Sequence, residues 1–424
     1  MSRARTVLTA LAVLAVALLS VRASAGMAAG LDYFQDAGTA IDALARGDLQ
    51  GFFANQPLMG SFSLLLRAPF VAAVFDQSLD TVYYVGALPC VAATLVLGVV
   101  LGRLAADRGQ PPAVQGIVAG LAVINPLTFR ALHWGHPEEL LAAALCVGAV
   151  IAALRERSLL AGLLLGLALA TKQWAVLAIL PALLAAPRQR LALAAIAGAI
   201  AAALTLPALL LNADQFSGVA TAAAGQSGGA TSTTPWNVWW PFAELQTVPR
   251  LGTRWMSPAW VPALSHPLIV AAGVVLPLLL WRRRTRRPDD ALLLLALLFL
   301  LRCMLDNWDN VYYHVPFLLS LLAWESVRRP GVPAITLAVT LLISASFWER
   351  LTWIFPGSAP DAPWLFALYM AWTLPLAAAL ALVLYRPEAV LRQYHRRRGS
   401  STGPAAVRHR AGPGGDRGLG RQSA

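Results

Sequence analysis

Apolar runs separated by short polar turns make up most of this chain. Many of these runs approach or exceed the ~20 residues that an α-helix needs to cross a bilayer. We expect spans at about 7–24, 81–102, 113–131, 138–154, 190–211, 264–281, 289–304, 311–325, 332–347 and 364–385. The pattern predicts an all-α, polytopic integral membrane protein.

The apolar run 159–186 differs from the others, because Lys172, the only lysine of the chain, lies near its centre. As one helix this run would be about 42 Å long, whereas the apolar core of a bilayer is about 30 Å thick. A hairpin of two short helices that turns at residues 170–174 ("ATKQW") fits better. It places Lys172 at the ends of two helices, and the whole chain then has about 12 spans.

Arginine clusters predict the side on which each turn lies, because cytoplasmic loops are enriched in Arg and Lys. With the hairpin, both termini and all of the following clusters are cytoplasmic: Arg3 and Arg5, Arg103 and Arg108, Arg155 and Arg157, Arg188 and Arg190, residues 282–287, and Arg328 and Arg329. We expect the first apolar run to stay as an anchor, since Arg22 interrupts the small-residue pattern of a signal-peptide cleavage site. A cleaved signal peptide is the alternative.

The composition agrees with a multi-pass protein of the plasma membrane. Only 13% of the residues are charged, about half the share in soluble domains. The net charge of +12 falls mostly on cytoplasmic turns and on a basic tail, residues 391–424, that we expect to be disordered beyond a membrane domain of residues 1–390. This distribution indicates contact with membrane lipids and gives no sign of nucleic-acid binding.

Two long connections, about 25–80 and 212–263, are both external in this topology, and connections of such length usually have a function. In the first, residues 59–75 fit a helix in the membrane interface, because the segment is short and contains Arg67 and Pro69. The second holds Trp236, Trp239, Trp240, Trp255 and Trp260. These rings belong either to an interfacial aromatic belt or to a surface on which a sugar stacks.

Polar side chains gather on the predicted outer side, in the connections between spans. They are His133, His136, Glu138, Glu139, Lys172, His266, Arg302, Asp306, Asp309 and His314. An ionisable group at membrane depth indicates a functional site by default, and an ammonium suits a phosphate. Snorkelling from a helix end is the structural alternative for Lys172 and Arg302.

Other motifs are weaker. The residues define no certain cofactor site. The oxygens of "DNWDN" (306–310) could bind a divalent cation, with helix capping as the alternative. His133, His136 and Glu138 could also bind a metal, with an ordinary loop as the alternative. The three cysteines, Cys90, Cys146 and Cys303, are too dispersed for a disulfide or metal motif and fit small core residues. The pairs Gly98 and Gly102, Gly116 and Gly120, and Gly162 and Gly166 have the spacing of close helix packing rather than of phosphate loops.

Two stretches carry a resemblance to a known family. Residues 124–190 read "INPLTFRALHWGHPEELL" at their start and "AGLLLGLALATKQWAVLAILP" later, and residues 31–49 read "LDYFQDAGTAIDALARGDL". In this order the chain resembles the GT-C class of polyprenyl-phosphate-dependent glycosyltransferases, in particular the mannosyltransferases of glycosyltransferase family 87. The resemblance extends over about residues 7–210, and over the remainder only in general layout.

The resemblance implies a GT-C-like fold and a reaction on the outer face. A sugar, mannose, would pass from a polyprenyl-phosphate donor to a lipid or cell-envelope glycan acceptor. The family's general base matches Asp32, with Asp36 as second candidate, and Lys172 matches its phosphate-binding lysine, with Arg302 assisting. Substrate contacts are then expected from His133, His136, Glu138, Trp236, Trp239, Asp306, Tyr313 and His314.

One departure and two alternatives stay open. Where the family often has Gly-Gln, this chain has Gly135 and His136 before Pro137, which leaves the acceptor and metal use undecided. A transporter or lipid-linked-sugar flippase is the first alternative, although it would more often show internal repeats and midplane charges. A non-catalytic assembly or sensor protein is the second.

Overall fold

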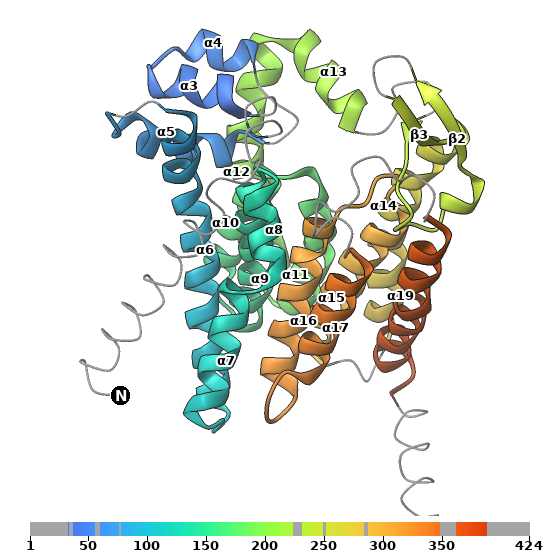
Figure 1. Cartoon of the computed structure of the whole chain (residues 1–424). Coiled ribbons are helices and arrows are strands. Elements are labelled where there is room, and N and C mark those ends of the chain that lie inside the picture. Colours follow the sequence, from blue (N-terminus) through green and yellow to red (C-terminus); the bar gives the residue numbers. More distant parts are fainter. Residues whose placement is uncertain are drawn as a thin grey trace, which may run out of the picture.

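The computed structural model describes residues 33, 37–55, 60–75, 78–223, 231–248, 252–283, 287–347 and 362–387. The expected first span at 7–24, the tail 391–424, Asp32 and Asp36 therefore lie outside the described residues. The fold is that of a helical membrane protein (Figure 1), as predicted. Six helices or joined helices among the described residues are long and apolar enough to cross a membrane: residues 81–107, 112–133, 137–154, 190–211, 260–281 and 363–385.

The long helices run roughly alongside one another (Figure 1) and follow the predicted apolar runs closely. They are α6 (Leu79–Asp107), α7 (Pro112–Val123), α8 (Pro126–His133), α9 (Pro137–Leu154), α10 (Ser158–Leu169), α11 (Ile179–Ala185), α12 (Arg190–Leu211), α14 (Trp260–Trp281), α15 (Asp290–Leu305), α16 (Val315–Arg328), α17 (Ala334–Ser346) and α19 (Ala362–Tyr385). The 3-10 helices η2 (Gln173–Ala178) and η4 (Val311–His314) lead into α11 and α16. The expected span at 113–131 is broken between α7 and α8, where the Asn125 side chain accepts hydrogen bonds from the N–H groups of Leu127 and Thr128 and so starts a new helix.

Both long connections fold at the same end of the bundle, which we call the loop end (Figure 1). The first forms α3 (Thr39–Ala45), α4 (Leu49–Ala54) and α5 (Ser61–Ala72), and the second begins with α13 (Ala213–Ala223). The second also folds into a small antiparallel sheet of β1 (Thr231–Ser232), β3 (Gly252–Ser257) and β2 (Glu244–Val248), in that order, which the sequence did not predict. A short 3-10 helix, η3 (Trp240–Phe242), precedes β2.

The predicted hairpin at 159–186 is present. The helix α10 ends at Leu169, and the chain resumes in η2 and α11 after the turn at residues 170–172. Because Arg188 forms an ion pair with Glu156 at 3.5 Å, the end of the hairpin returns to the level of its beginning. At the other end, Gly60 and Phe62 donate backbone hydrogen bonds to the carbonyls of Thr171 and Ala170, so the turn lies against the start of α5.

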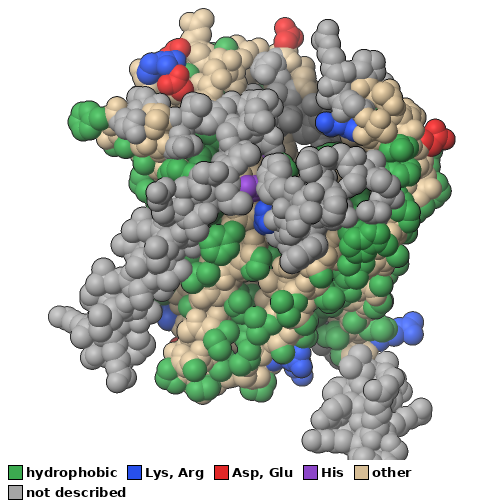
Figure 2. Space-filling view, viewed as in Figure 1, with side chains coloured by type: hydrophobic (Ala, Val, Ile, Leu, Met, Phe, Trp, Pro, Cys, Tyr) green, Lys and Arg blue, Asp and Glu red, His purple; other side chains and the backbone are tan. Residues whose placement is uncertain are grey.

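Of the arginine clusters expected on one side, those between Arg103 and Arg190 and at Arg328 and Arg329 lie at one end of the bundle, whereas Arg3, Arg5 and residues 284–286 are outside the described residues. Ion pairs join Arg155 to Asp107 and Arg328 to Asp289, and Gln110 accepts from the N–H of Gly331. In Figure 2, Lys and Arg side chains lie at both ends of the molecule, whereas the Asp and Glu side chains in view lie only at the loop end. Hydrophobic side chains cover the face between them, as the bilayer requires.

Three helices, α9, α15 and α16, form the centre of the molecule and are buried along nearly their whole length. Close packing at glycines sets the distances between some of their neighbours. A Cβ atom on Gly166 would lie 2.8 Å from both the Ala197 carbonyl oxygen and the Ile200 Cβ, so α10 can approach α12 this closely only without a side chain there. The same prediction was wrong for Gly116 and Gly120, where an added Cβ would meet nothing within 4 Å.

Candidate active site

Charged side chains from three turns and from α5 meet at the loop end of the buried centre. We call this set the charged cluster: Arg67 on α5, His136, Glu138 and Glu139 at the start of α9, Lys172 at the hairpin turn, and Arg302 in the last turn of α15. The turn after α8 supplies the first helical residues of α9, so both glutamates lie in its first turn, where carboxylates interact favourably with the helix dipole.

Glu138 is the central residue of the charged cluster. Its side chain is fully buried. One carboxylate oxygen, Oε1, lies 3.0 Å from Nδ1 of His136 and 3.1 Å from Nζ of Lys172, and Oε2 lies 3.6 Å from a guanidinium nitrogen of Arg67. The His136 ring stacks on Tyr312, which fixes the imidazole beside the carboxylate.

Lys172 is held by both glutamates, since its Nζ also lies 3.2 Å from Oε1 of Glu139. An ammonium has three N–H donors, so two glutamate contacts leave one donor for a ligand. The Lys172 side chain is 14% exposed, whereas its glutamate partners are buried. Among these three ion-paired side chains, Lys172 is therefore the one that an anion from outside can contact.

Arg302 forms no ion pair with any other described residue at the distances of those above. One guanidinium nitrogen donates to the carbonyl of Tyr313 at 3.3 Å, and the guanidinium carbon lies over the rings of Tyr313 and Trp174, 4.4 Å and 5.3 Å from their centroids. Trp174 in turn donates to the Glu139 oxygen that contacts Lys172. The planar face of the Arg302 guanidinium is thus fixed by two aromatic rings, and most of its five donors have no partner among the described residues.

The buried charges of the cluster do not cancel. Arg67, Lys172 and Arg302 carry three positive charges, and only the Glu138 and Glu139 carboxylates balance them within the buried set. Asp306 is close to Arg302 in sequence but is partly exposed, and its Oδ1 accepts from the N–H of Trp308 and lies 3.9 Å from Nε2 of His266. A surplus cation away from water is costly without a partner, so the arrangement is suited to bind an anion.

Tyr33 connects the first external segment to this cluster. Its ring is fully buried, lies 4.6 Å from the guanidinium carbon of Arg67, and packs edge-on against Tyr83. Asp32 precedes Tyr33 directly in the chain, while its own position and that of Asp36 lie outside the described residues.

Three residues predicted to contact the substrate, His133, Trp236 and Trp239, pack against protein groups outside the charged cluster. His133 is buried at the end of α8, with its ring edge-on to Trp134. Trp236 donates to the carbonyl of Ser346 and stacks on Phe347, and Trp239 donates to the carbonyl of Leu305. Both indole rings are buried and pack against protein, so in this structure they hold the loop onto the bundle.

A second buried polar group adjoins the charged cluster beyond Tyr313. The thiol of Cys303 donates to the Tyr313 carbonyl that Arg302 also contacts. Nε2 of His314 lies 2.8 Å from the Tyr369 hydroxyl, and that hydroxyl donates to Oδ2 of Asp309 at 3.2 Å. Burial, followed by the neighbouring Asp306 carboxylate, raises the pKa of the Asp309 carboxyl well above its usual range; the protonated form is favoured there in the absence of a cation.

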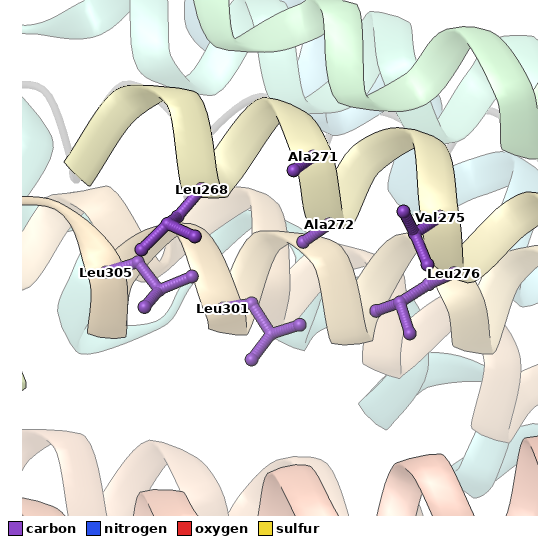
Figure 3. Close-up of a pocket in the computed structure, with 7 residues that line it drawn as sticks. All are labelled: Leu268, Ala271, Ala272, Val275, Leu276, Leu301 and Leu305. Atoms are coloured by element: carbon purple, nitrogen blue, oxygen red, sulfur yellow. The ribbon is translucent and has the colours of Figure 1, made fainter. Parts of the chain in front are cut away.

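An apolar groove runs between α14 and α15 on the side of Leu301 and Leu305 (Figure 3). Its volume is about 370 Å³, and its walls are almost wholly apolar: Leu268, Ala271, Ala272, Val275, Leu276, Leu301 and Leu305. Arg302 lies between Leu301 and Leu305 in the sequence of α15, but it is not one of the residues that line the groove. The groove and Arg302 are therefore on the same part of one helix, on different faces of it.

Sequence reasoning missed several members of this site. It assigned Arg67 to an interfacial helix and did not predict the contact with Glu138. It placed Glu139 on the same side without giving it a role, and it did not select Trp174, Tyr312 or Tyr369. A signal for Arg67 was present, because an arginine within the apolar run 61–72 is expected to have a functional or structural partner. The aromatic residues carried no such signal.

Comparisons with known proteins identify the family. The family profile of glycosyltransferase family 87 matches residues 62–305, more than half of the chain. That range includes Arg67, Glu138, Lys172 and Arg302. No curated protein matches the chain.

A solved structure shares the fold. It is ArnT from Cupriavidus metallidurans, crystallised with undecaprenyl phosphate, which superimposes with a TM-score of 0.50 over 94% of this chain and 73% of its own. The sequence identity is 17%, so this likeness concerns the fold alone.

Proposed function

Because the chain belongs to glycosyltransferase family 87, we propose that it transfers mannose from a polyprenyl-phosphate donor to a lipid or cell-envelope glycan acceptor. The observation that carries this proposal is the buried charge of the cluster, in which three cations face two carboxylates; an apolar groove borders the same helix, α15. A polyprenyl-phosphate sugar has the two matching properties, since its phosphate is anionic and its chain is apolar.

The donor phosphate would be bound by Lys172 and Arg302. Lys172 supplies the ammonium donor that Glu138 and Glu139 leave unused, and Arg302 supplies a guanidinium already oriented by Trp174 and Tyr313. During transfer, the bond between the anomeric carbon and the phosphate oxygen breaks and the phosphate gains negative charge. Cations already fixed in place stabilise that charge without having to reorganise.

The prenyl chain of the donor would lie in the groove between α14 and α15 (Figure 3). Support comes from Leu301 and Leu305, groove residues on the same helical segment as Arg302, and from the exposed apolar side chains of Leu268 and Val275 on α14. The neighbour of similar fold, ArnT, was crystallised with undecaprenyl phosphate, a ligand of the same chemical class.

The acceptor hydroxyl would be deprotonated by Asp32, with Asp36 as second candidate. A carboxylate suits this step because the hydroxyl must lose its proton as its oxygen attacks the anomeric carbon. Tyr33, the residue after Asp32, is fixed on Arg67, which ties this part of the chain to the cluster. Direct displacement would invert the configuration at the anomeric carbon.

The reaction would take place on the outer face of the plasma membrane. With the arginine-rich end of the bundle in the cytoplasm, the charged cluster and both long connections face outward, and both termini are cytoplasmic. The donor and acceptor then reach the site from the outer leaflet.

Purified Asp32→Asn protein tests the assignment of the base. With radiolabelled polyprenyl-phosphate mannose and a cell-envelope lipid extract as acceptor, we expect transfer to fall about 10²–10⁴-fold. The matched control is Asp42→Asn on α3, whose exposed carboxylate pairs only with Arg46 among the described residues and should leave transfer unchanged. Undiminished transfer by Asp32→Asn would exclude Asp32 as the base.

A flippase for the same lipid-linked sugar is the second candidate, favoured by the apolar groove alone. The two are separated by the product, since a flippase moves the intact donor and forms no glycosidic bond. Appearance of free polyprenyl phosphate together with a mannosylated acceptor in detergent, where no leaflets exist, would exclude it.

A further inference from the structure

The second polar group, made by Cys303, Asp309, His314 and Tyr369, is not used by the proposed transfer reaction. Each of the first three residues contributes a metal-ligating atom, and these atoms all lie within 4.8 Å of one another. All three side chains are buried. A sulfur, an imidazole nitrogen and a carboxylate oxygen are the ligand types that zinc prefers.

The distance between the His314 and Asp309 ligand atoms matches one edge of a tetrahedral metal site. Nε2 of His314 lies 3.6 Å from Oδ2 of Asp309, which is too long for a hydrogen bond. A tetrahedron with metal–ligand bonds of about 2.0–2.3 Å has edges of about 3.3–3.8 Å. Oδ1 of Asp309 is buried and has no hydrogen-bond partner, which a buried carboxylate oxygen rarely lacks.

The surrounding residues hold these ligands in place before any ion binds. Asp309 is anchored through its backbone, because its N–H and its carbonyl both bond to the hydroxyl of Thr234. His314 ends η4, and its Nε2, the atom that faces Asp309, is positioned by the Tyr369 hydroxyl at 2.8 Å. Tyr369 on α19 supplies a hydroxyl to both His314 and Asp309.

We propose that Cys303, Asp309 and His314 bind a zinc ion, with Tyr369 as the fourth ligand or as the hydrogen-bond donor that orients Asp309. On binding, the Cys303 thiol loses its proton to solvent and its bond to the Tyr313 carbonyl, and the thiolate becomes a ligand. The ion joins the end of α15, the 306–310 turn, η4 and α19. It does not depend on the proposed transfer reaction; by releasing the Tyr313 carbonyl from Cys303 it leaves that carbonyl to Arg302.

Metal content measured on the full chain tests this site. The protein is produced with zinc in the medium and an affinity tag free of histidine, purified in detergent, dialysed against a weak chelator and analysed by mass spectrometry of its metals. We expect about one zinc ion per chain, lost in Cys303→Ala and retained in Cys146→Ala. Cys146 is the matched control, because it is an equally buried cysteine in a central helix.

Replacement of zinc by Co²⁺ gives a second test, which uses a more conservative variant in case Cys303→Ala folds poorly. Co²⁺ bound to a thiolate gives an intense near-ultraviolet charge-transfer band, which we expect in the wild type and in Cys146→Ala. The conservative Cys303→Ser should bind Co²⁺ without that band. A wild-type protein with neither stoichiometric zinc nor this band, or a zinc content unchanged in both Cys303→Ala and His314→Ala, would overturn the proposal.

Discussion

Glu138 shows how a single buried carboxylate organises the candidate active site. It contacts a histidine, a lysine and an arginine that come from three separate segments. A buried ion pair stabilises a fold little compared with well-packed apolar residues, but removal of one partner is costly because the other charge stays buried and unpaired. Here one substitution would leave two cations, Arg67 and Lys172, without their shared partner.

We therefore expect Glu138→Gln to lower the free energy of unfolding by about 3–5 kcal/mol. The neutral amide keeps the shape of the side chain, so the loss reports the charge. Thermal unfolding of the purified protein in detergent measures it. Glu156→Gln is the control, since the Glu156–Arg188 pair is mostly exposed and should matter little; equal melting temperatures for all three proteins would contradict a central role for Glu138.

At the scale of elements, the hairpin α10–η2–α11 positions Lys172. Its two arms are short, its turn is bonded to Gly60 and Phe62, and α10 lies close against α12 at Gly162 and Gly166. A displacement of α10 must therefore move the turn that carries Lys172. The packing of a helix pair and the geometry of the phosphate site are coupled through this one turn.

Gly166→Ala tests this coupling. The added methyl group would lie 2.8 Å from the Ala197 carbonyl oxygen, so α10 must shift and we expect a loss of about 1–3 kcal/mol in stability together with weaker donor binding. Gly116→Ala makes the same change on α7, where nothing lies within 4 Å. Melting curves and the KM for the donor should separate the two variants, and identical behaviour would show that α10 and α12 adjust freely.

The sequence predicted these helices well, because apolar runs and arginine clusters can be recognised without any knowledge of tertiary contacts. The hairpin break at Lys172 followed from the length of the run and from the arginines at both of its ends, and topology placed Glu138, Lys172 and Arg302 on one side. The contacts of Arg67 and Tyr369 could not be predicted in this way. Helices such as α9 and α15 are apolar on all sides, so no amphipathic pattern shows which face meets which neighbour.

At the scale of the whole molecule, charge is separated along the bundle. Arginine-rich turns lie at one end, and the charged cluster, the external helices and the small sheet lie at the other (Figures 1 and 2). If the arginine-rich end is cytoplasmic, every part of the candidate active site is reached from outside the cell.

Two glutamine-to-cysteine variants test this orientation. Gln246 on β2 and Gln189 before α12 are both exposed, at opposite ends of the bundle, while the three native cysteines are buried and give a low background. A membrane-impermeant maleimide should label Gln246→Cys in intact cells and Gln189→Cys only after permeabilisation. The reverse pattern would place the site in the cytoplasm and contradict an outer-leaflet reaction.

The contact of α19 with the centre has a consequence for biosynthesis. Tyr369, near the end of the described chain, is the partner that Asp309 and His314 share. During translation, Asp309 and His314 are made before Tyr369, and they lack that hydroxyl until α19 packs against the centre. A chain cut short before α19 would keep the described residues of the charged cluster, but it would leave the buried Asp309 and His314 side chains without the hydroxyl that joins them.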